Sequence, residues 1–393
     1  MSAVSRSLRR GLKRLLSGGT APVPPAHDAN LLFLQYESAL GAAALATATF
    51  AAIKSARPDL RIAVAASGLP LELLRASPHI EELIKTPHAV KSFWAALVFY
   101  LRAFSSRRRE FSYVLTDLSQ GRRKIAFLAL SSGARFRIGL SPTPELFHVA
   151  LKQDKRRSNL DNNLDIVRAL GLDVITAEPA IHFTSDDLAK VEAILAEVPA
   201  VVGPRIAVIA NSSKGHPNEW FDDRWTELIR RLQHRLDAQI IFVGAKGDAP
   251  QIERIREAAG VPTFSAAGRT DLPQLAALLA LCDLVVTIDT GGLHVARAVN
   301  APAVVLANAA QPDNWWLPPK TDPRFRILRH GDVPCALCLK FACATRECMQ
   351  ESTVDMVEQA VIDHLAAFPA SVEARAKRAA ARTNDRTPIL TCP

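Results

Sequence analysis

The strongest constraint on the fold of this chain is an alternation of short apolar runs with helix-forming segments, which occurs twice. The first series starts at residues 30–36 (NLLFLQY) and continues to a strand predicted at 136–139. The second starts at 205–210 (RIAVIA) and continues to a strand predicted at 303–306. Such alternation predicts parallel sheets with helices on both faces. Two series of similar length in 393 residues predict two doubly wound, Rossmann-like α/β domains.

Composition and charge exclude several classes of protein. The chain is 49% hydrophobic and 22% charged, which is typical of globular proteins and excludes disordered and coiled-coil chains. No apolar run reaches the roughly 18 to 20 residues that span a bilayer, so we expect a soluble or peripheral protein. The net charge of +9 is spread along the chain without a nucleic-acid-binding motif. We therefore expect no nucleic-acid partner, whereas an anionic glycolipid would suit this charge.

The N-terminal 19 residues, MSAVSRSLRRGLKRLLSGG, are basic and contain leucines at helical spacing. They carry no acid and lack the apolar core of a secretory signal. One interpretation is a helix that contacts the inner membrane peripherally, and the other is a solvated tail. The six cysteines show no disulfide spacing through the body of the chain, which predicts a reducing, cytoplasmic location.

The same patterns predict the domain boundaries. We expect a basic tail at 1–28, an N-terminal domain at 29–185, a linker at 186–204, a C-terminal domain at 205–368 and a second basic tail at 369–393. Ligands of doubly wound domains bind outside the carboxyl ends of the strands.

The most informative stretch is DLVVTIDTGGLHVARAV, residues 283–299, in which a buried strand runs directly into a helix. The turn contains Asp289, Thr290, Gly291 and Gly292, and His294 lies in the first helical turn. Free N–H groups at such a helix start attract diphosphate, and Asp289 is suited to accept from a sugar hydroxyl. The alternative is an ordinary turn in which Asp or Thr caps the helix.

A second strand end carries hydroxyls and a cation. The strand that ends at Ala210 is followed by Asn211, Ser212, Ser213 and Lys214. Such side chains suit phosphate oxygens, although they are also ordinary in loops.

Taken together, DTGGLH, NSSKGHPNEW, VGAKGD and AVVLANAAQPDNWWLP resemble glycosyltransferase family 9, the ADP-heptose lipopolysaccharide heptosyltransferases. The likeness extends back through SALGAAALAT, REFSYVLTDLSQGRRKIAFLAL and NNLDIVRALGLD, over about residues 30–365. It implies the glycosyltransferase B architecture, in which an acceptor-side N-terminal domain and a donor-binding C-terminal domain face a cleft. It also implies inverting transfer from ADP-heptose to the lipopolysaccharide core without a cofactor for catalysis.

The resemblance also implies roles for particular residues. Asp289, Thr290, Gly291, Gly292 and His294 match the donor-binding turn. Ser212 and Ser213 match a hydroxyl pair near the diphosphate, and we assign Lys214 to the same site.

This chain departs from the family at two positions. The family's catalytic aspartate is replaced by Ala42, which cannot accept a proton. Glu37 is the nearest substitute, or else an ordinary surface residue. Asn218 stands where the family places a lysine before Trp220, so Lys214, His216 or no residue supplies that charge.

Two basic groups, 107–109 and 122–124, lie near a helix end and after a strand. The second group would meet acceptor phosphates if it faces the cleft, and otherwise both are solvated surface.

A cysteine cluster has the spacing Cys335-x₂-Cys338-x₄-Cys343-x₄-Cys348. Four thiolates so spaced can surround one structural zinc or iron ion, and the alternative is free thiols or a reversible disulfide. The cluster is expected away from the sugar chemistry.

The sequence thus predicts a heptosyltransferase of the cytoplasmic face of the inner membrane. A catalytically silent relative that binds nucleotide sugar or glycolipid is the alternative, because Ala42 replaces the base.

Overall fold

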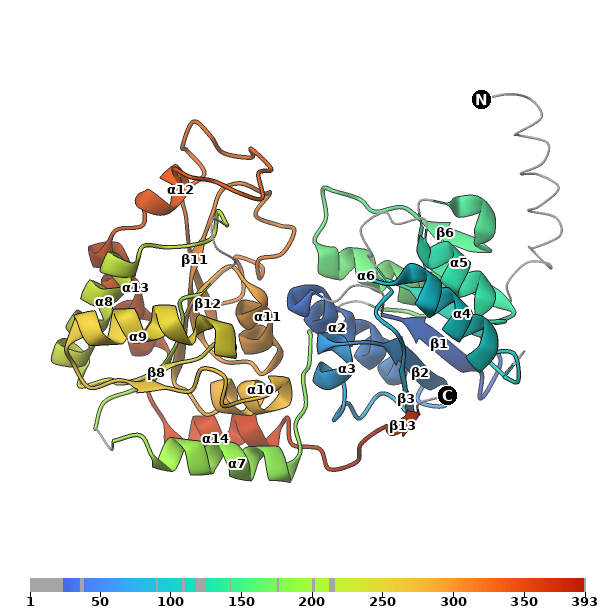
Figure 1. Cartoon of the computed structure of the whole chain (residues 1–393), viewed down its shortest axis with the longest axis horizontal. Helices are drawn as coiled ribbons and strands as arrows, with labels where there is room; N and C mark the ends of the chain where they lie inside the picture. The colour runs from blue at the N-terminus through green and yellow to red at the C-terminus, as the bar shows by residue number, and fades with distance from the viewer. Residues whose placement is uncertain are drawn as a thin grey trace. The chain divides into compact units, whose positions relative to one another are not determined.

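The structure, a computed structural model, describes residues 24–35, 39–89, 91–107, 110–117, 124–141, 143–174, 177–199, 202–211 and 216–391. The chain divides into two compact units. Unit 1 comprises Met1–Pro179 with Arg386–Pro393, and unit 2 comprises Ala180–Asp385 (Figure 1). Each unit has its own parallel sheet with helices on both faces, so the predicted α/β class is confirmed.

The sheet of unit 1 has the strand order β13-β3-β2-β1-β4-β5-β6, and every described pair is parallel. Its strands are β1 (Asn30–Leu34), β2 (Arg61–Ala66), β3 (Glu82–Lys85), β4 (Tyr113–Thr116), β5 (Phe136–Leu140), β6 (Val149–Leu151) and β13 (Ile389–Thr391). β1 is the central strand. β2 and β3 follow it on one side, and β4, β5 and β6 follow it on the other.

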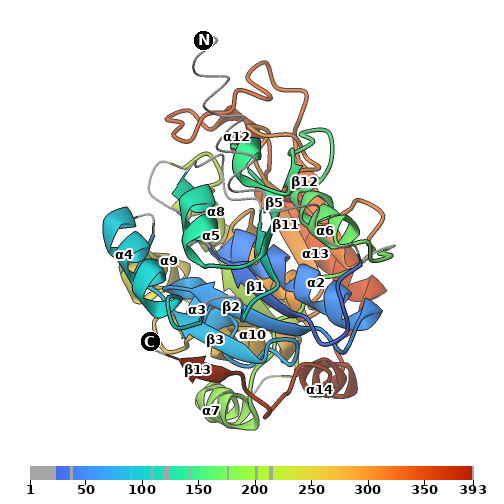
Figure 2. The ribbon, with the colours of Figure 1, turned by 90° about the vertical axis from the view of Figure 1, so that its right-hand side faces the viewer.

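The helices of unit 1 pack a largely aliphatic core onto this sheet (Figure 2). They are α2 (Leu40–Ala56), α3 (Leu69–Leu73), α4 (Phe93–Ala103), α5 (Lys124–Ser131), the 3₁₀ turn η1 (Pro144–Leu146) and α6 (Asn159–Ala169). Helix α2 is rich in alanine and is buried continuously over 43–50, because small side chains allow it to lie close to its neighbours. The ring of Phe50 in α2 meets that of Phe33 in β1 edge-on at 4.9 Å.

The sheet of unit 2 has the order β12-β11-β10-β7-β8-β9 and is also parallel. Its strands are β7 (Arg205–Ile209), β8 (Gln239–Phe242), β9 (Phe264–Ser265), β10 (Leu284–Ile288), β11 (Ala303–Ala307) and β12 (Phe325–Arg329). The central strands read RIAVI, LVVTI and AVVLA. Such uninterrupted β-branched runs are typical of strands covered on both faces.

The helices of unit 2 cover its sheet with amphipathic faces. They are α7 (Ser185–Ala196), α8 (Asp222–Leu236), η2 (Lys246–Asp248), α9 (Ala249–Ala259), α10 (Leu272–Ala280), α11 (Gly291–Ala298), α12 (Glu347–Gln350), α13 (Val354–Ala367) and α14 (Val372–Ala380). Helix α8 buries Trp225, Leu228, Ile229 and Leu232 along one stripe. None of the described helices is long and apolar enough to cross a membrane.

Two predicted connecting segments are folded instead. The linker expected at 186–204 mostly forms α7, which starts at a capping box of Thr184 and Asp187. The basic tail expected at 369–393 contains α14 and β13, and β13 pairs with β3 (Figures 1 and 2). The expectation of a separate tail was wrong, because α14 is anchored by a buried partner that lies far upstream.

That partner is Asp283, whose side chain is 2% exposed. It accepts hydrogen bonds from the Arg375 guanidinium of α14 at 2.5 Å, from Ser371 N at 3.2 Å and from Arg205 N at 2.8 Å. One carboxylate therefore joins α14 to the start of β7.

We expect Asp283→Ala to lower the free energy of unfolding by about 3 kcal/mol, because it leaves Arg375 and two amides without their acceptor. Asp355→Ala is the matched control: it removes another Arg–Asp pair of 2.5 Å whose aspartate is 83% exposed. That change should cost less than about 1 kcal/mol. Urea unfolding measures both, and equal losses would contradict this account of α14.

Candidate functional site

The strand order of unit 2 identifies the carboxyl ends of two central strands as the candidate ligand site. From β7 the chain continues to β8 and β9 on one side and later to β10, β11 and β12 on the other. Ligands of doubly wound sheets bind at such a switch point, outside the carboxyl ends of the two strands. Thr287 of β10 is in register with Ile209 of β7, so the strands end side by side. Both predicted motifs therefore follow adjacent strand ends.

The turn after β10 leaves the start of α11 open. Thr290 is the N-cap residue with extended backbone (φ −139°), and its side chain makes no capping hydrogen bond. The N–H groups of the first turn of α11, at Gly291 and Gly292, therefore lack the side-chain cap that the ordinary-turn alternative requires. A helix start in this condition attracts an anion.

Gly292 has a packing role. A Cβ at this position would lie 2.6 Å from Cδ1 and 3.2 Å from Cγ2 of Ile209 in β7. The absence of a side chain therefore lets α11 approach the adjacent strand closely.

Burial shifts the pKa of both titratable groups of the turn. Desolvation raises the pKa of Asp289 to about 6, which makes its carboxyl a weak acid for an aspartate. Desolvation, with a smaller contribution from Arg297, lowers the pKa of His294 to about 3, so the ring is neutral at pH 7. An anion at this turn would consequently be held by amides and hydroxyls rather than by a histidine cation.

His294 packs against an aromatic ring of unit 2. Its side chain is buried, and its ring lies edge-on to that of Trp316 with centroids 6.0 Å apart. Among the described residues, nothing hydrogen-bonds its Nδ1 atom. His294 thus supports the turn from inside the unit.

The loop after β7 is joined to the turn by Asn218. Ser212, Ser213 and Lys214 lie outside the described residues, so their assignment to the site stays a prediction. Asn218 is buried, and its Nδ2 donates to the backbone oxygen of Asp289. The residue that replaces the family's lysine is therefore a structural link between the two loops.

His216 does not supply the missing positive charge. Its Nδ1 accepts from Asn218 N at 3.2 Å, and burial lowers the pKa of its ring. Trp220 belongs to the core, where its Nε1 donates to the backbone oxygen of Ser352 at 3.0 Å.

Unit 1 has its own switch point, between β1 and β4, and this site was missed from the sequence. Gln35 follows β1 and Asp117 follows β4, and both are buried. Gln35 Nε2 donates to Asp117 Oδ2 at 3.0 Å. The signal was an acid directly after an apolar strand, but only the sheet order shows that this strand lies beside β1.

Only some of the other residues that we singled out in unit 1 lie within the described ranges. Ala42 lies in the first turn of α2, whereas Glu37 lies outside the described residues. Arg107 pairs with Glu82 and Glu110, so it is committed to the fold of unit 1. Of the remaining basic residues, 108–109 and 122–123 are not described, and Lys124 Nζ lies over the Phe93 ring at 5.2 Å from its centroid.

The cysteine segment is hydrogen-bonded to the chain that follows β11. Leu337 N donates to Ala309 O at 2.7 Å and Leu339 N to Ala310 O at 2.9 Å, directly after β11. Both leucines have left-handed backbone, with φ of 58° and 54°. The cysteine segment is therefore held against the residues that follow β11, and its distance from the sugar chemistry stays a prediction.

Within the described ranges, no three of these thiols bring their sulfur atoms within 4.8 Å of one another. The three groups that do meet this distance are His27, Asp28 and Asp59, where the Arg57 guanidinium already binds both carboxylate oxygens of Asp59. The metal at Cys335, Cys338, Cys343 and Cys348 stays a prediction.

If the cluster holds an ion, elemental analysis of the purified full chain should find about one equivalent of zinc or iron, and Cys338→Ser should lose it. Cys282→Ser is the control, because Cys282 is buried elsewhere in unit 2. Absence of metal from the wild-type chain, with six reactive thiols after unfolding, would leave the cluster as free cysteines.

The raised pKa of Asp289 predicts that the stability of the chain depends on pH. Its folded-state pKa of about 6 exceeds the ordinary value of 3.8, so the folded chain binds the proton more tightly. The favourable contribution of this bound proton to the free energy of unfolding is complete below about pH 4. It is lost as the pH rises through 6. Asp289→Asn should therefore gain stability relative to wild type between pH 4 and pH 7, on the order of 1–2 kcal/mol. A difference that does not vary with pH would refute the burial of this carboxyl.

Solved structures with this fold define the class of protein. A glycosyltransferase family 9 protein from Veillonella parvula superposes with a TM-score of 0.76 at 16% identity, covering 88% of this chain and 100% of that one. ADP-heptose lipopolysaccharide heptosyltransferase II of Escherichia coli gives 0.68 at 17% identity, covering 86% and 99%. The chain therefore has the α/β fold of the glycosyltransferase B type.

The family follows from the sequence match. The model of glycosyltransferase family 9 (heptosyltransferase) matches residues 104–348, more than half of the chain. This chain belongs to glycosyltransferase family 9.

Its curated relatives are heptosyltransferases. Lipopolysaccharide heptosyltransferase 3 of Escherichia coli is 23% identical over 287 residues, 69% of this chain and 81% of that protein. Lipooligosaccharide heptosyltransferase 2 of Haemophilus influenzae is 31% identical over 153 residues, 38% and 42% of the two chains.

Proposed function

We propose that this chain transfers heptose from ADP-heptose, with inversion, to a lipopolysaccharide core acceptor at the cytoplasmic face of the inner membrane. Family membership supports transfer of a sugar. One structure of similar fold contains ADP, and another contains ADP-2-deoxy-2-fluoro heptose. The observation that carries the proposal is the uncapped start of α11 at the switch point between β7 and β10.

The donor's diphosphate would lie against the first-turn amides of α11, where the helix dipole favours negative charge. The Thr290 hydroxyl would add a donor. Asp289 would accept from a hydroxyl of ribose or heptose. Burial raises the pKa of its carboxyl to about 6, so it becomes protonated beside an approaching diphosphate more readily than an ordinary aspartate would.

The displacement needs a proton acceptor. The acceptor oxygen attacks the anomeric carbon, the bond from that carbon to the diphosphate breaks, and the hydroxyl proton must leave. A positioned base contributes about 10² to 10⁴ in rate. Ala42 cannot perform this role, so another carboxylate of unit 1 must replace it if the chain is active.

Asp117 is our candidate for this base. It follows the strand adjacent to β1 at the switch point of unit 1, and Gln35 orients its carboxylate through the 3.0 Å hydrogen bond. Glu37, predicted from the sequence, remains the competing candidate.

We expect Asp117→Asn to lower kcat by about 10² to 10⁴ while the KM for ADP-heptose changes little, because the change removes a base but no donor contact. ADP release is measured with purified full chain and a panel of lipopolysaccharide core acceptors. Asp173→Asn, an exposed residue of unit 1, is the matched control.

Two further variants separate the rival explanations. Loss of activity in Glu37→Gln, with Asp117→Asn unaffected, would assign the base to Glu37. Binding of ADP-heptose without turnover in wild type, with turnover restored by Ala42→Asp, would identify a catalytically silent relative. That alternative is favoured by the alanine alone.

A further inference from the structure

Helix α4 presents an apolar row to solvent on the outside of unit 1. Trp94, Val98 and Leu101 lie on one helical face and are 74%, 45% and 54% exposed. The opposite face is buried through Ala96 and Tyr100. The adjacent helix α5 adds Phe127, which is 49% exposed. We call the set Trp94, Val98, Leu101 and Phe127 the α4 face.

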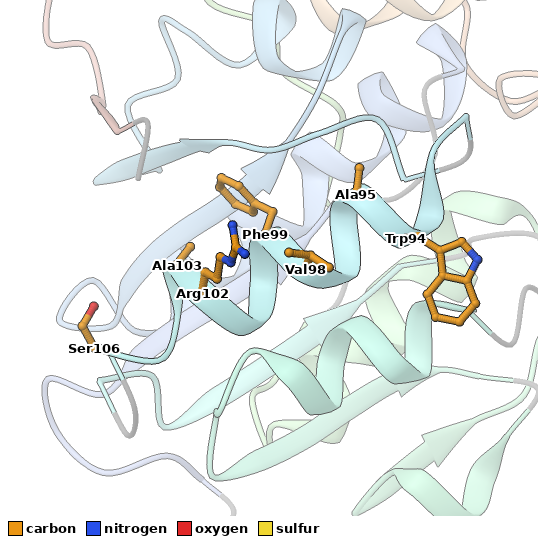
Figure 3. A pocket seen from close by; sticks show the side chains of 7 residues that line it. All are labelled: Trp94, Ala95, Val98, Phe99, Arg102, Ala103 and Ser106. Carbon is orange, nitrogen blue, oxygen red and sulfur yellow. The ribbon is translucent and has the colours of Figure 1, made fainter.

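The α4 face is accompanied by a groove along the same helix. The groove has a volume of about 850 Å³ and is open to solvent (Figure 3). The residues that line it are Trp94, Ala95, Val98, Phe99, Arg102, Ala103 and Ser106. Single exposed apolar residues are normal on a protein surface, but three large ones on one face of α4, with a fourth on the helix packed beside it, are typical of an interaction site.

Exposed basic residues flank the α4 face along the chain. Lys91, Arg102 and Lys124 are exposed, and the sequence contains no acid between Glu82 and Glu110. Those two glutamates are paired with Arg107. The α4 face is therefore apolar with a cationic border, which complements a surface that is apolar inside and anionic outside.

We propose that the α4 face docks onto an anionic phospholipid surface. Trp94 and Leu101 enter the headgroup boundary, where an indole ring is well accommodated. Lys91 and Lys124 meet lipid phosphates, and the Arg102 stem lies along the groove while its guanidinium reaches the headgroups.

Charge favours lipid over the other occupants of this face. A second copy of the chain would bring the same three cations against those of the first. The N-terminal residues 6–14 carry leucines but also five basic residues, so they too would be repelled. An anionic lipid surface meets the apolar and the cationic groups together.

The test is co-sedimentation of the full chain with vesicles, without sugar donor or acceptor. Wild type should bind vesicles that contain phosphatidylglycerol, bind phosphatidylcholine vesicles weakly, and dissociate at high salt. The double variant Trp94→Ser/Leu101→Ser should lower the partition coefficient by about tenfold or more. Each of Lys91→Gln and Lys124→Gln should lower it by about fivefold.

Val372→Ser is the matched control, because Val372 is 73% exposed on α14 of unit 2 and should leave binding unchanged. Thermal unfolding confirms that each variant is folded. The proposal is overturned if wild type ignores anionic vesicles or if the double variant binds as wild type does. It is also overturned if the double variant abolishes self-association of the chain while vesicle binding persists. None of these results depends on whether the chain transfers heptose.

Discussion

The pairing of β10 with β7 is the constraint on which the functional site depends. These strands run parallel and in register, although about 80 residues separate them along the chain. Their carboxyl ends therefore place the turn at Asp289 beside the loop that begins at Asn211. Asn218 then joins the two loops by donating to the backbone of Asp289. A defect in this pairing would separate the two halves of the site without changing any residue that touches a ligand.

The electrostatics of the turn differ from those of a site built on cations. Asp289 and His294 are both shifted by desolvation towards their uncharged forms. The positive potential at the turn comes from the amides and dipole of α11, which cannot titrate. Recognition of an anion by backbone amides depends on the position of the helix, and that position depends on Gly292 lying against Ile209.

The two units follow one plan with different chemistry at their switch points. Unit 2 has an open helix start there, whereas unit 1 has a carboxylate held by an amide side chain, Asp117 with Gln35. Unit 1 thus carries a buried carboxylate at the carboxyl ends of its strands. The C-terminal segment contributes to both units, since α14 belongs to unit 2 and β13 pairs with β3 in the sheet of unit 1.

Local patterns in the sequence determined the α/β class, the two sheets and the turn after β10, because strand and helix periodicity and a glycine-rich helix start are properties of adjacent residues. The sequence also revealed the spacing of the cysteine cluster, and its resemblance to the family implied that Ala42 replaces an acid. It did not reveal that 369–393 is folded, because the charge that anchors α14 is Asp283, far away along the chain. Nor did it reveal Asp117, because only the order of the strands brings the end of β4 beside the end of β1. Tertiary structure decided these points, since burial, partner and pKa are set by residues that meet only when the sheet is assembled.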